Sequence, residues 1–174
     1  MGKEIVYFYL GNIYNFNHIY EKAIKYYNKS LKIAPDRVYS LNNRGIALEY
    51  LTEYTDAISS YDKVLAIDSN NIFALNNRGI TFGKLGRYED AISSFNDALK
   101  IDPNFDMARH NLNYALFQLE LGKYKKTNFS VANLENFKSK KDFHVCFREK
   151  SLNTYERVQY ISITYQSAEN SYHL

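Results

Sequence analysis

The sequence has one cysteine, two prolines, seven glycines and no long apolar run among its 174 residues. A single cysteine, Cys146, excludes an intrachain disulfide. No stretch of 18 apolar residues occurs, so no membrane-spanning helix is predicted. The N-terminus lacks a secretory signal pattern, and Val6 stands where a myristoylation signal needs Ser or Thr. With 45% hydrophobic residues, we expect a folded, cytoplasmic chain of one or two packed units.

The charge is small overall and unevenly distributed. The formal net charge is +3, too small to indicate a nucleic-acid-binding protein by itself. The stretch from Lys123 to Lys150 holds 8 Lys and Arg against 3 Asp and Glu, with aromatic residues interleaved. This pattern could suit RNA or an anionic membrane, but the acidic residues dilute it. We interpret the lysines as solvated and expect no nucleic-acid partner.

The pentapeptide LNNRG occurs twice, 34 residues apart, at 41–45 and 75–79. Aligned without a gap, residues 38–71 and 72–105 share 17 of 34 positions, and the same frame extends upstream to Glu4. A constant period of this length indicates stacked structural units. Each unit has helical apolar spacing twice, with sequences such as LGRY between the two segments and IDPN between units. Each unit is therefore predicted to be a pair of helices.

A glycine interrupts the first helix of each unit, at Gly11, Gly45 and Gly79. Glycine within a helix costs about 1 kcal/mol relative to alanine, so close helix packing must compensate. We expect Gly45 to face Ala57 and Gly79 to face Ala91. Three large aromatic residues are expected to fill the space between pairs: Tyr27, Tyr61 and Phe95.

These features resemble the tetratricopeptide repeat family, whose 34-residue pattern is matched in the third unit by Leu75, Arg78, Gly79, Phe82, Ala91, Phe95, Ala98 and Pro103. The resemblance implies an all-α fold, an α-solenoid forming a right-handed superhelix. Its predicted parts are three helix-turn-helix repeats, 4–37, 38–71 and 72–105, and a capping helix, 106–121. The first large residue is Tyr7, Leu41 or Leu75 rather than Trp, and Ser69 replaces a proline.

Residues 122–174 form a basic and then Tyr-rich C-terminal extension. Helical spacing of apolar residues at 129–141 is compatible with a degenerate fourth repeat helix. The segment from Leu152 to Tyr165 is compatible with a further helix, but YISITY within it would equally suit a strand. The sequence leaves both alternatives open.

Catalytic and metal-binding patterns are scarce. His144 and Cys146 alternate as H-x-C, whereas a zinc site needs about four ligands. Cys146 lacks a local nucleophile signature, and the glycines follow the repeat rather than forming a phosphate-binding loop. We expect no enzymatic activity, no cofactor, no metal and no small-molecule substrate.

The resemblance implies that the first helices line a concave groove. In the repeat frame, Asn43, Asn77 and Asn111 occupy the same position of consecutive units and are expected to form a column. An asparagine amide can bond to both the N–H and C=O of an extended peptide. The column resembles the asparagine ladder in the repeat region of O-GlcNAc transferases. The other predicted peptide-binding residues are Asn12, Asn42, Asn76, Tyr39, Phe73, Lys84, Met107 and Tyr114.

Two other interpretations bear on this groove. The asparagines could instead bond to solvent or to one another. The groove also resembles the carboxylate clamp of chaperone-binding repeat domains, because Asn12 and Asn43 match its asparagine positions. Phe8, Phe73 and Asn77, however, replace its two lysines and its arginine, so we expect no strong binding of acidic chaperone tails.

The sequence therefore predicts a non-catalytic protein-interaction module that binds an extended peptide segment of a partner. The alternative hypothesis is a structural self-association or complex-assembly subunit, acting through the ends of the stack or the C-terminal extension.

Overall fold

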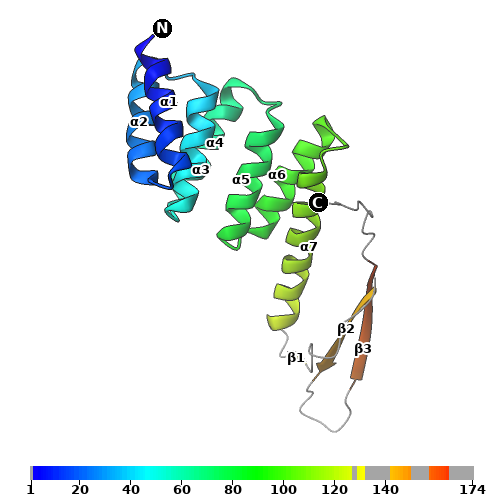
Figure 1. Cartoon of the computed structure of the whole chain (residues 1–174). Coiled ribbons are helices and arrows are strands. Elements are labelled where there is room, and N and C mark those ends of the chain that lie inside the picture. Colours follow the sequence, from blue (N-terminus) through cyan, green and yellow to red (C-terminus); the bar gives the residue numbers. More distant parts are fainter. Residues whose placement is uncertain (1, 127–128, 132–141, 150–156, 165–174) are drawn as a thin grey trace, which may run out of the picture. The chain divides into compact units, whose positions relative to one another are not determined.

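The computed structural model describes residues 2–126, 129–131, 142–149 and 157–164 (Figure 1). The chain divides into two units, Met1–Leu119 and Glu120–Leu174. The first is entirely helical and holds the predicted repeats, and the second holds the strands.

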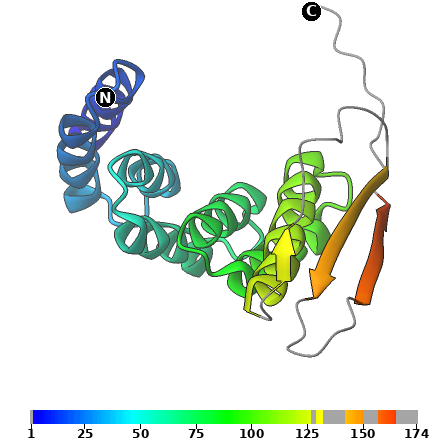
Figure 2. The ribbon, with the colours of Figure 1, turned by 90° about the horizontal axis from the view of Figure 1, so that it is seen from below.

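Each predicted repeat folds as one pair of helices, which confirms the all-α repeat solenoid. The pairs follow one another along a curve (Figure 2), and each helix packs on the next in the chain. Their bounds are α1 Lys3–Phe16, α2 Tyr20–Ile33, α3 Val38–Tyr50, α4 Tyr54–Ile67, α5 Ile72–Lys84 and α6 Tyr88–Ile101.

The turn inside each repeat contains one residue in the left-handed region. His18, Thr52 and Gly86, spaced by 34, have φ of 59°, 62° and 74°. Only the third repeat places a glycine there, the residue that adopts this conformation without steric cost. The first two repeats therefore adopt the same turn with a less suitable residue.

The helical glycines pack differently from our prediction. A Cβ added to Gly45 would lie 2.5 Å from Cε1 of Tyr61, and one added to Gly79 would lie 2.5 Å from Cε1 of Phe95. The nearest atoms facing each glycine thus belong to an aromatic ring of the same repeat. The prediction that the facing residues are Ala57 and Ala91 is wrong, although both alanines are fully buried. The missing Cβ makes room for the ring.

The helix α7, Asp106–Lys126, continues the stack after the third repeat. It is five residues longer than the predicted capping helix. Ala108 and Ala115 of α7 join a buried cluster with residues of the third repeat: Leu75, Ala91, Phe95 and Ala98. The beginning of α7 therefore covers the end of the repeat core, as expected of a cap.

The C-terminal unit contains a three-stranded antiparallel sheet in the order β1-β2-β3. Its strands are β1 Phe129–Val131, β2 Asp142–Glu149 and β3 Arg157–Thr164. In register, Phe129 pairs with Glu149, and Val145 pairs with Ile161.

The sheet corrects the expectations for this segment. The helix expected from residue 129 is wrong at its start, because 129–131 form a strand, and residues 132–141 lie outside the described residues. Of the two alternatives left open for YISITY, the strand is the one observed, so the further helix is wrong over Arg157–Thr164. Among the helices that the structure describes, none combines the length and apolarity needed to cross a bilayer.

Candidate functional site

The exposed side of the first helices α3, α5 and α7 carries large apolar side chains, and this side is named the first-helix face. Tyr39, Phe73 and Met107, each the second residue of its helix, are 71%, 56% and 54% exposed. Tyr114, two turns further along α7, is 57% exposed. Exposed apolar residues that recur at one position of successive helices indicate an interaction surface rather than scattered exposure.

Asparagine side chains link the first helices of successive repeats. The Nδ2 group of Asn43 donates to Oδ1 of Asn12 at 3.0 Å. The next link, from Asn77 to Asn42, is longer, at 3.4 Å. The third, between Asn111 and Asn76, measures 3.0 Å. The predicted column is therefore part of a set of amide pairs, each joining one first helix to the preceding one.

These pairs use only part of the hydrogen-bonding capacity of the column. An asparagine amide has two N–H donors and one oxygen acceptor, and each residue of the column donates one N–H to its neighbour. Asn43, Asn77 and Asn111 stay partly exposed. Asn76, in contrast, is 3% exposed, so the prediction that it contacts a peptide is wrong; it serves as an acceptor between helices.

Buried tyrosine hydroxyls are bonded to the same face. Tyr27 donates to Oδ1 of Asn12 at 2.9 Å, and Tyr61 donates to Oε1 of Glu49 at 2.7 Å. Burial raises the pKa of Tyr27 to about 12, and a hydrogen bond with Asn43 offsets part of the rise. Burial first, and then the negative charge of Glu49, raises the pKa of Tyr61 well above its usual value. Both tyrosines therefore stay neutral at physiological pH.

The basic groups of α3 and α5 already have partners. Lys84 bonds to Oε2 of Glu49 at 2.6 Å, and Arg44 donates to the Ser60 hydroxyl at 2.7 Å. Predicted as a peptide-binding residue, Lys84 instead joins the first helices of the second and third repeats. Its ammonium group is thus already engaged in the absence of a ligand.

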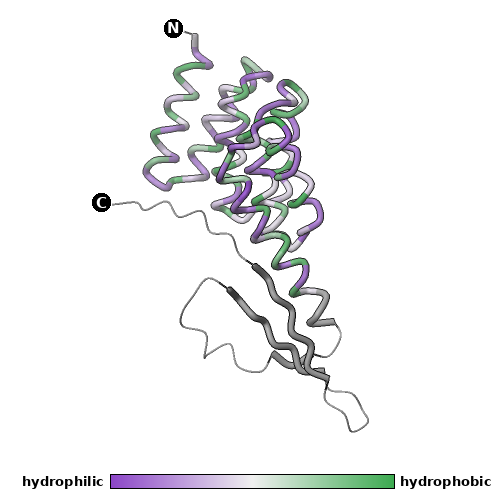
Figure 3. Tube along the Cα trace, turned by 90° about the vertical axis from the view of Figure 1, so that its right-hand side faces the viewer, coloured by the Kyte–Doolittle hydropathy of each residue, from purple (hydrophilic) through white to green (hydrophobic). Residues whose placement is uncertain are grey.

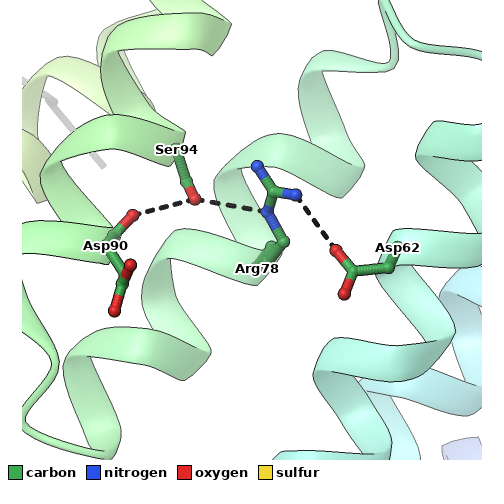
Figure 4. A network of polar contacts seen from close by, with 4 residues as sticks. All are labelled: Asp62, Arg78, Asp90 and Ser94. Carbon is green, nitrogen blue, oxygen red and sulfur yellow. Dashed lines mark hydrogen bonds and ion pairs between the residues drawn. The ribbon is translucent and has the colours of Figure 1, made fainter.

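Arg78 connects three helices (Figure 4). Its Nη1 lies 3.0 Å from Oδ1 of Asp62 on α4, and its Nε donates to the Ser94 hydroxyl on α6 at 3.3 Å. Ser94 in turn donates to the backbone oxygen of Asp90. The recurring arginine of NNRG therefore has a structural role at the junction of repeats.

Most of the predicted site residues thus lie on one face. The sequence named the acceptors Asn12, Asn42 and Asn76 as peptide-binding residues and left bonding of the asparagines to one another open as an alternative, which these pairs show. It did not identify which amides pair or the Glu49 contacts, because these depend on the offset between helices. A second surface feature, a shallow hollow on α6, is lined by Ser93, Asn96, Asp97, Leu99 and Lys100. It lies on a second helix, away from the first-helix face. In the part of the chain that the structure describes, no cluster of three metal-binding side chains occurs.

Comparisons with known proteins agree with the geometry. Family models described as tetratricopeptide repeat match residues 5–37 and 72–105 and residues 38–71. The comparison with curated proteins gives no match.

Solved structures show the same architecture. The first repeat domain of Spaghetti (RPAP3), bound to the HSP90 peptide SRMEEVD, is 25% identical, with a TM-score of 0.65, covering 68% of this chain and 94% of that one. The Sgt2 domain from Aspergillus fumigatus is 18% identical, with a TM-score of 0.68 and coverage of 78% and 91%. The TPR2B domain of yeast Sti1, in complex with pHsp70, is 20% identical, with a TM-score of 0.62 and coverage of 69% and 98%.

Proposed function

Because the chain belongs to the tetratricopeptide repeat family, we propose that its first-helix face binds an extended peptide segment of a partner protein. The recurring exposed residues Tyr39, Phe73 and Met107, beside the partly exposed amide column, are the observation that carries this proposal. Similar domains of other proteins are solved with peptides, which supports the mode of binding but not the identity of the ligand.

The amide column contributes the part of recognition that is independent of peptide sequence. Asn77 and Asn111 each keep a second N–H and an oxygen that can bond to a peptide backbone. Asn43, whose amide also bonds to Tyr27, keeps its oxygen. Neighbouring first helices are about 10 Å apart, and an extended peptide rises about 3.3 Å per residue. A peptide that crosses the helices would therefore meet one asparagine amide at every third residue. The existing amide pairs hold these side chains in place, so little rotamer entropy is lost on binding.

The exposed aromatic residues contribute the selectivity. Burying an aromatic side chain against a ligand supplies most of the free energy at such a surface. We therefore propose that the preferred peptides carry apolar side chains that reach Tyr39, Phe73 and Met107.

Acidic C-terminal tails are not the proposed ligands. Phe8 and Phe73 stand at two positions where the carboxylate clamp has lysines, and Asn77 stands at its arginine position. Lys84 is already paired with Glu49, and Arg37 lies over the Phe8 ring at 4.9 Å. A pair of ligand carboxylates would meet few uncommitted cations here. The peptide SRMEEVD is expected to bind with a Kd weaker than about 100 µM, a ΔG of roughly −5.5 kcal/mol.

A displayed library of random peptides tests the proposal directly. It is selected in parallel against the wild type, the Phe73→Glu variant and the Ile67→Glu variant. Ile67 is 48% exposed at the end of α4, away from the first-helix face, so it is the matched control. We expect apolar peptides from the wild type and the control, and binding at least tenfold weaker to Phe73→Glu. Equal binding to all three proteins would contradict the proposed site.

The family is a protein-interaction fold, and we propose that this chain acts without catalysis, cofactor or small-molecule substrate. The cytoplasmic location and the lack of a nucleic-acid partner stay predictions.

A further inference from the structure

Four positions of each later first helix face the preceding repeat. They are the third, sixth, tenth and thirteenth residues, counted from Val38 in α3, from Ile72 in α5 and from Asp106 in α7. The third and tenth residues are small and at most 2% exposed, and they are Ser40, Ala47, Ala74, Thr81, Ala108 and Ala115. Ala47, for example, packs with Ala23 and Tyr27 of the first repeat.

The sixth and thirteenth positions face the same way. The sixth residue is the asparagine that donates back to the preceding first helix, as Asn43 does to Asn12. In α3 and α5 the thirteenth residue also contacts the preceding repeat. Tyr50 stacks on Tyr20 of the first repeat, with ring centroids 4.6 Å apart. Lys84 forms an ion pair with Glu49 across the next junction, between the second and third repeats.

In α1 the same four positions, counted from Glu4, carry large apolar residues. Val6, Tyr9, Ile13 and Phe16 are 43%, 53%, 57% and 83% exposed, and we name them the α1 stripe. Among the described residues, no helix packs on this side of α1. Figure 3 shows apolar residues recurring along the helix next to the N-terminus. Their 3-4-3 spacing is that of a seam between two helices.

The rest of the surface of the first repeat carries tyrosine rings and lysine side chains that lie over them. The Tyr14 and Tyr26 rings stack with centroids 5.2 Å apart, and Tyr7 lies 6.2 Å from Tyr26. Lys29 lies 4.8 Å above the Tyr26 ring, and Lys22 lies 5.4 Å from the Tyr14 ring. Lysines over these partly exposed aromatic rings keep this part solvated. The α1 stripe lacks such a cover, because no Asp, Glu, Lys or Arg occurs between Glu4 and Glu21.

We propose that the α1 stripe binds the α1 stripe of a second copy of this chain, in an antiparallel pair around a two-fold axis. The 3-4-3 spacing reads the same in both directions. An antiparallel pair therefore places Val6 against Phe16 of the second copy, and Tyr9 against Ile13. Each contact occurs twice, as a two-fold interface requires.

The lack of charge on the α1 stripe is compatible with a second copy. Like charges brought together at a two-fold axis oppose dimerisation, and the α1 stripe contains none. Antiparallel helices also bring opposite ends of their dipoles together. The dimer goes beyond peptide binding and does not depend on it.

Sedimentation equilibrium of the intact chain over a wide concentration range tests the dimer. We expect a mass rising from 20.4 kDa to twice that value, and a monomer at all concentrations for Ile13→Glu. Ile33→Glu is the control, because Ile33 is 50% exposed on α2 of the same repeat, and it should dimerise like the wild type. Circular dichroism confirms that each variant is folded.

A mixture of two variants tests the antiparallel arrangement. Tyr9→Lys and Ile13→Glu should each be monomeric alone, and their mixture should dimerise because the new lysine faces the new glutamate. Phe73→Glu should leave the mass unchanged, which separates this result from a failure of peptide binding. Three results would overturn the proposal. The wild type could stay monomeric at the highest concentrations, Ile13→Glu could still dimerise, or the α1 stripe could bind only a helix of another protein.

Discussion

Gly79 and Gly83 of α5 lie one turn apart, and replacing each with alanine should change the free energy of unfolding in opposite directions. A Cβ on Gly79 would lie 2.5 Å from Cε1 and 2.8 Å from Cδ1 of Phe95, which is roughly 0.7 to 1.5 Å inside the usual contact distance of about 3.5–4.0 Å. Phe95 is 2% exposed, so its ring lies in the core, where side chains are closely packed and a shift is costly. Around Gly83, in contrast, no atom lies within 4 Å of an added Cβ.

The magnitudes follow from two opposing effects. Alanine gains up to about 1 kcal/mol over glycine in a helix, and somewhat less near a helix end such as Gly83. Overpacking a core costs about 1–3 kcal/mol, and the contact at Gly79 is at the severe end. We expect Gly79→Ala to lower the free energy of unfolding by about 2 kcal/mol and Gly83→Ala to raise it by about 0.5 kcal/mol.

Urea unfolding followed by circular dichroism measures both variants. A double-mutant cycle with Phe95→Leu adds a control. If the ring is the obstacle, Gly79→Ala should cost less beside leucine than beside phenylalanine. Gly79→Ala at or above wild-type stability would refute the packing of the ring on the glycine.

Three further predictions concern the repeat turns, the repeat junctions and the buried tyrosines. Thr52→Gly should raise the free energy of unfolding by about 0.5–1 kcal/mol, because Thr52 is exposed and its φ of 62° disfavours a side chain. A lower free energy of unfolding, measured with urea, would contradict this. Arg78→Ala should lower the free energy of unfolding by about 1–2 kcal/mol in the same assay, because it breaks contacts to two helices. Lys100→Ala breaks only an exposed ion pair, so it should change the free energy of unfolding by no more than about 0.5 kcal/mol. Above pH 10 the unfolded chain loses tyrosine protons that the folded chain keeps, so stability should fall by up to about 1.4 kcal/mol per pH unit for each buried tyrosine. Because the pKa of Tyr61 is raised, Tyr61→Phe should weaken this alkaline dependence, and an unchanged pH profile would speak against it.

The repeat made the helical part of the fold predictable. Two 34-residue segments that are identical at half of their positions locate the same turns twice. The observed helices α3 and α5 begin at Val38 and Ile72, the first residues of the predicted second and third units. The extension has no second copy for comparison, so short apolar runs such as YISITY could not be assigned from local spacing alone.

The contacts between helices were less predictable than the helices. Ala57 and Tyr61 are four residues apart on α4 and lie on the same side of the helix, so the sequence could not decide which one faces Gly45. The asparagine column has the same limit. Its members share a position in the repeat, but their bonding partners depend on the offset between successive first helices, which spacing does not specify.

Chemical-shift mapping by NMR, with a peptide selected from the library, tests the central claim most directly. We predict saturation at one peptide per chain, with the largest changes on the first-helix face around Tyr39, Phe73 and Met107 and in the side-chain amides of Asn43 and Asn77. Changes confined to the second helices, such as the α6 hollow lined by Asn96, would contradict the account.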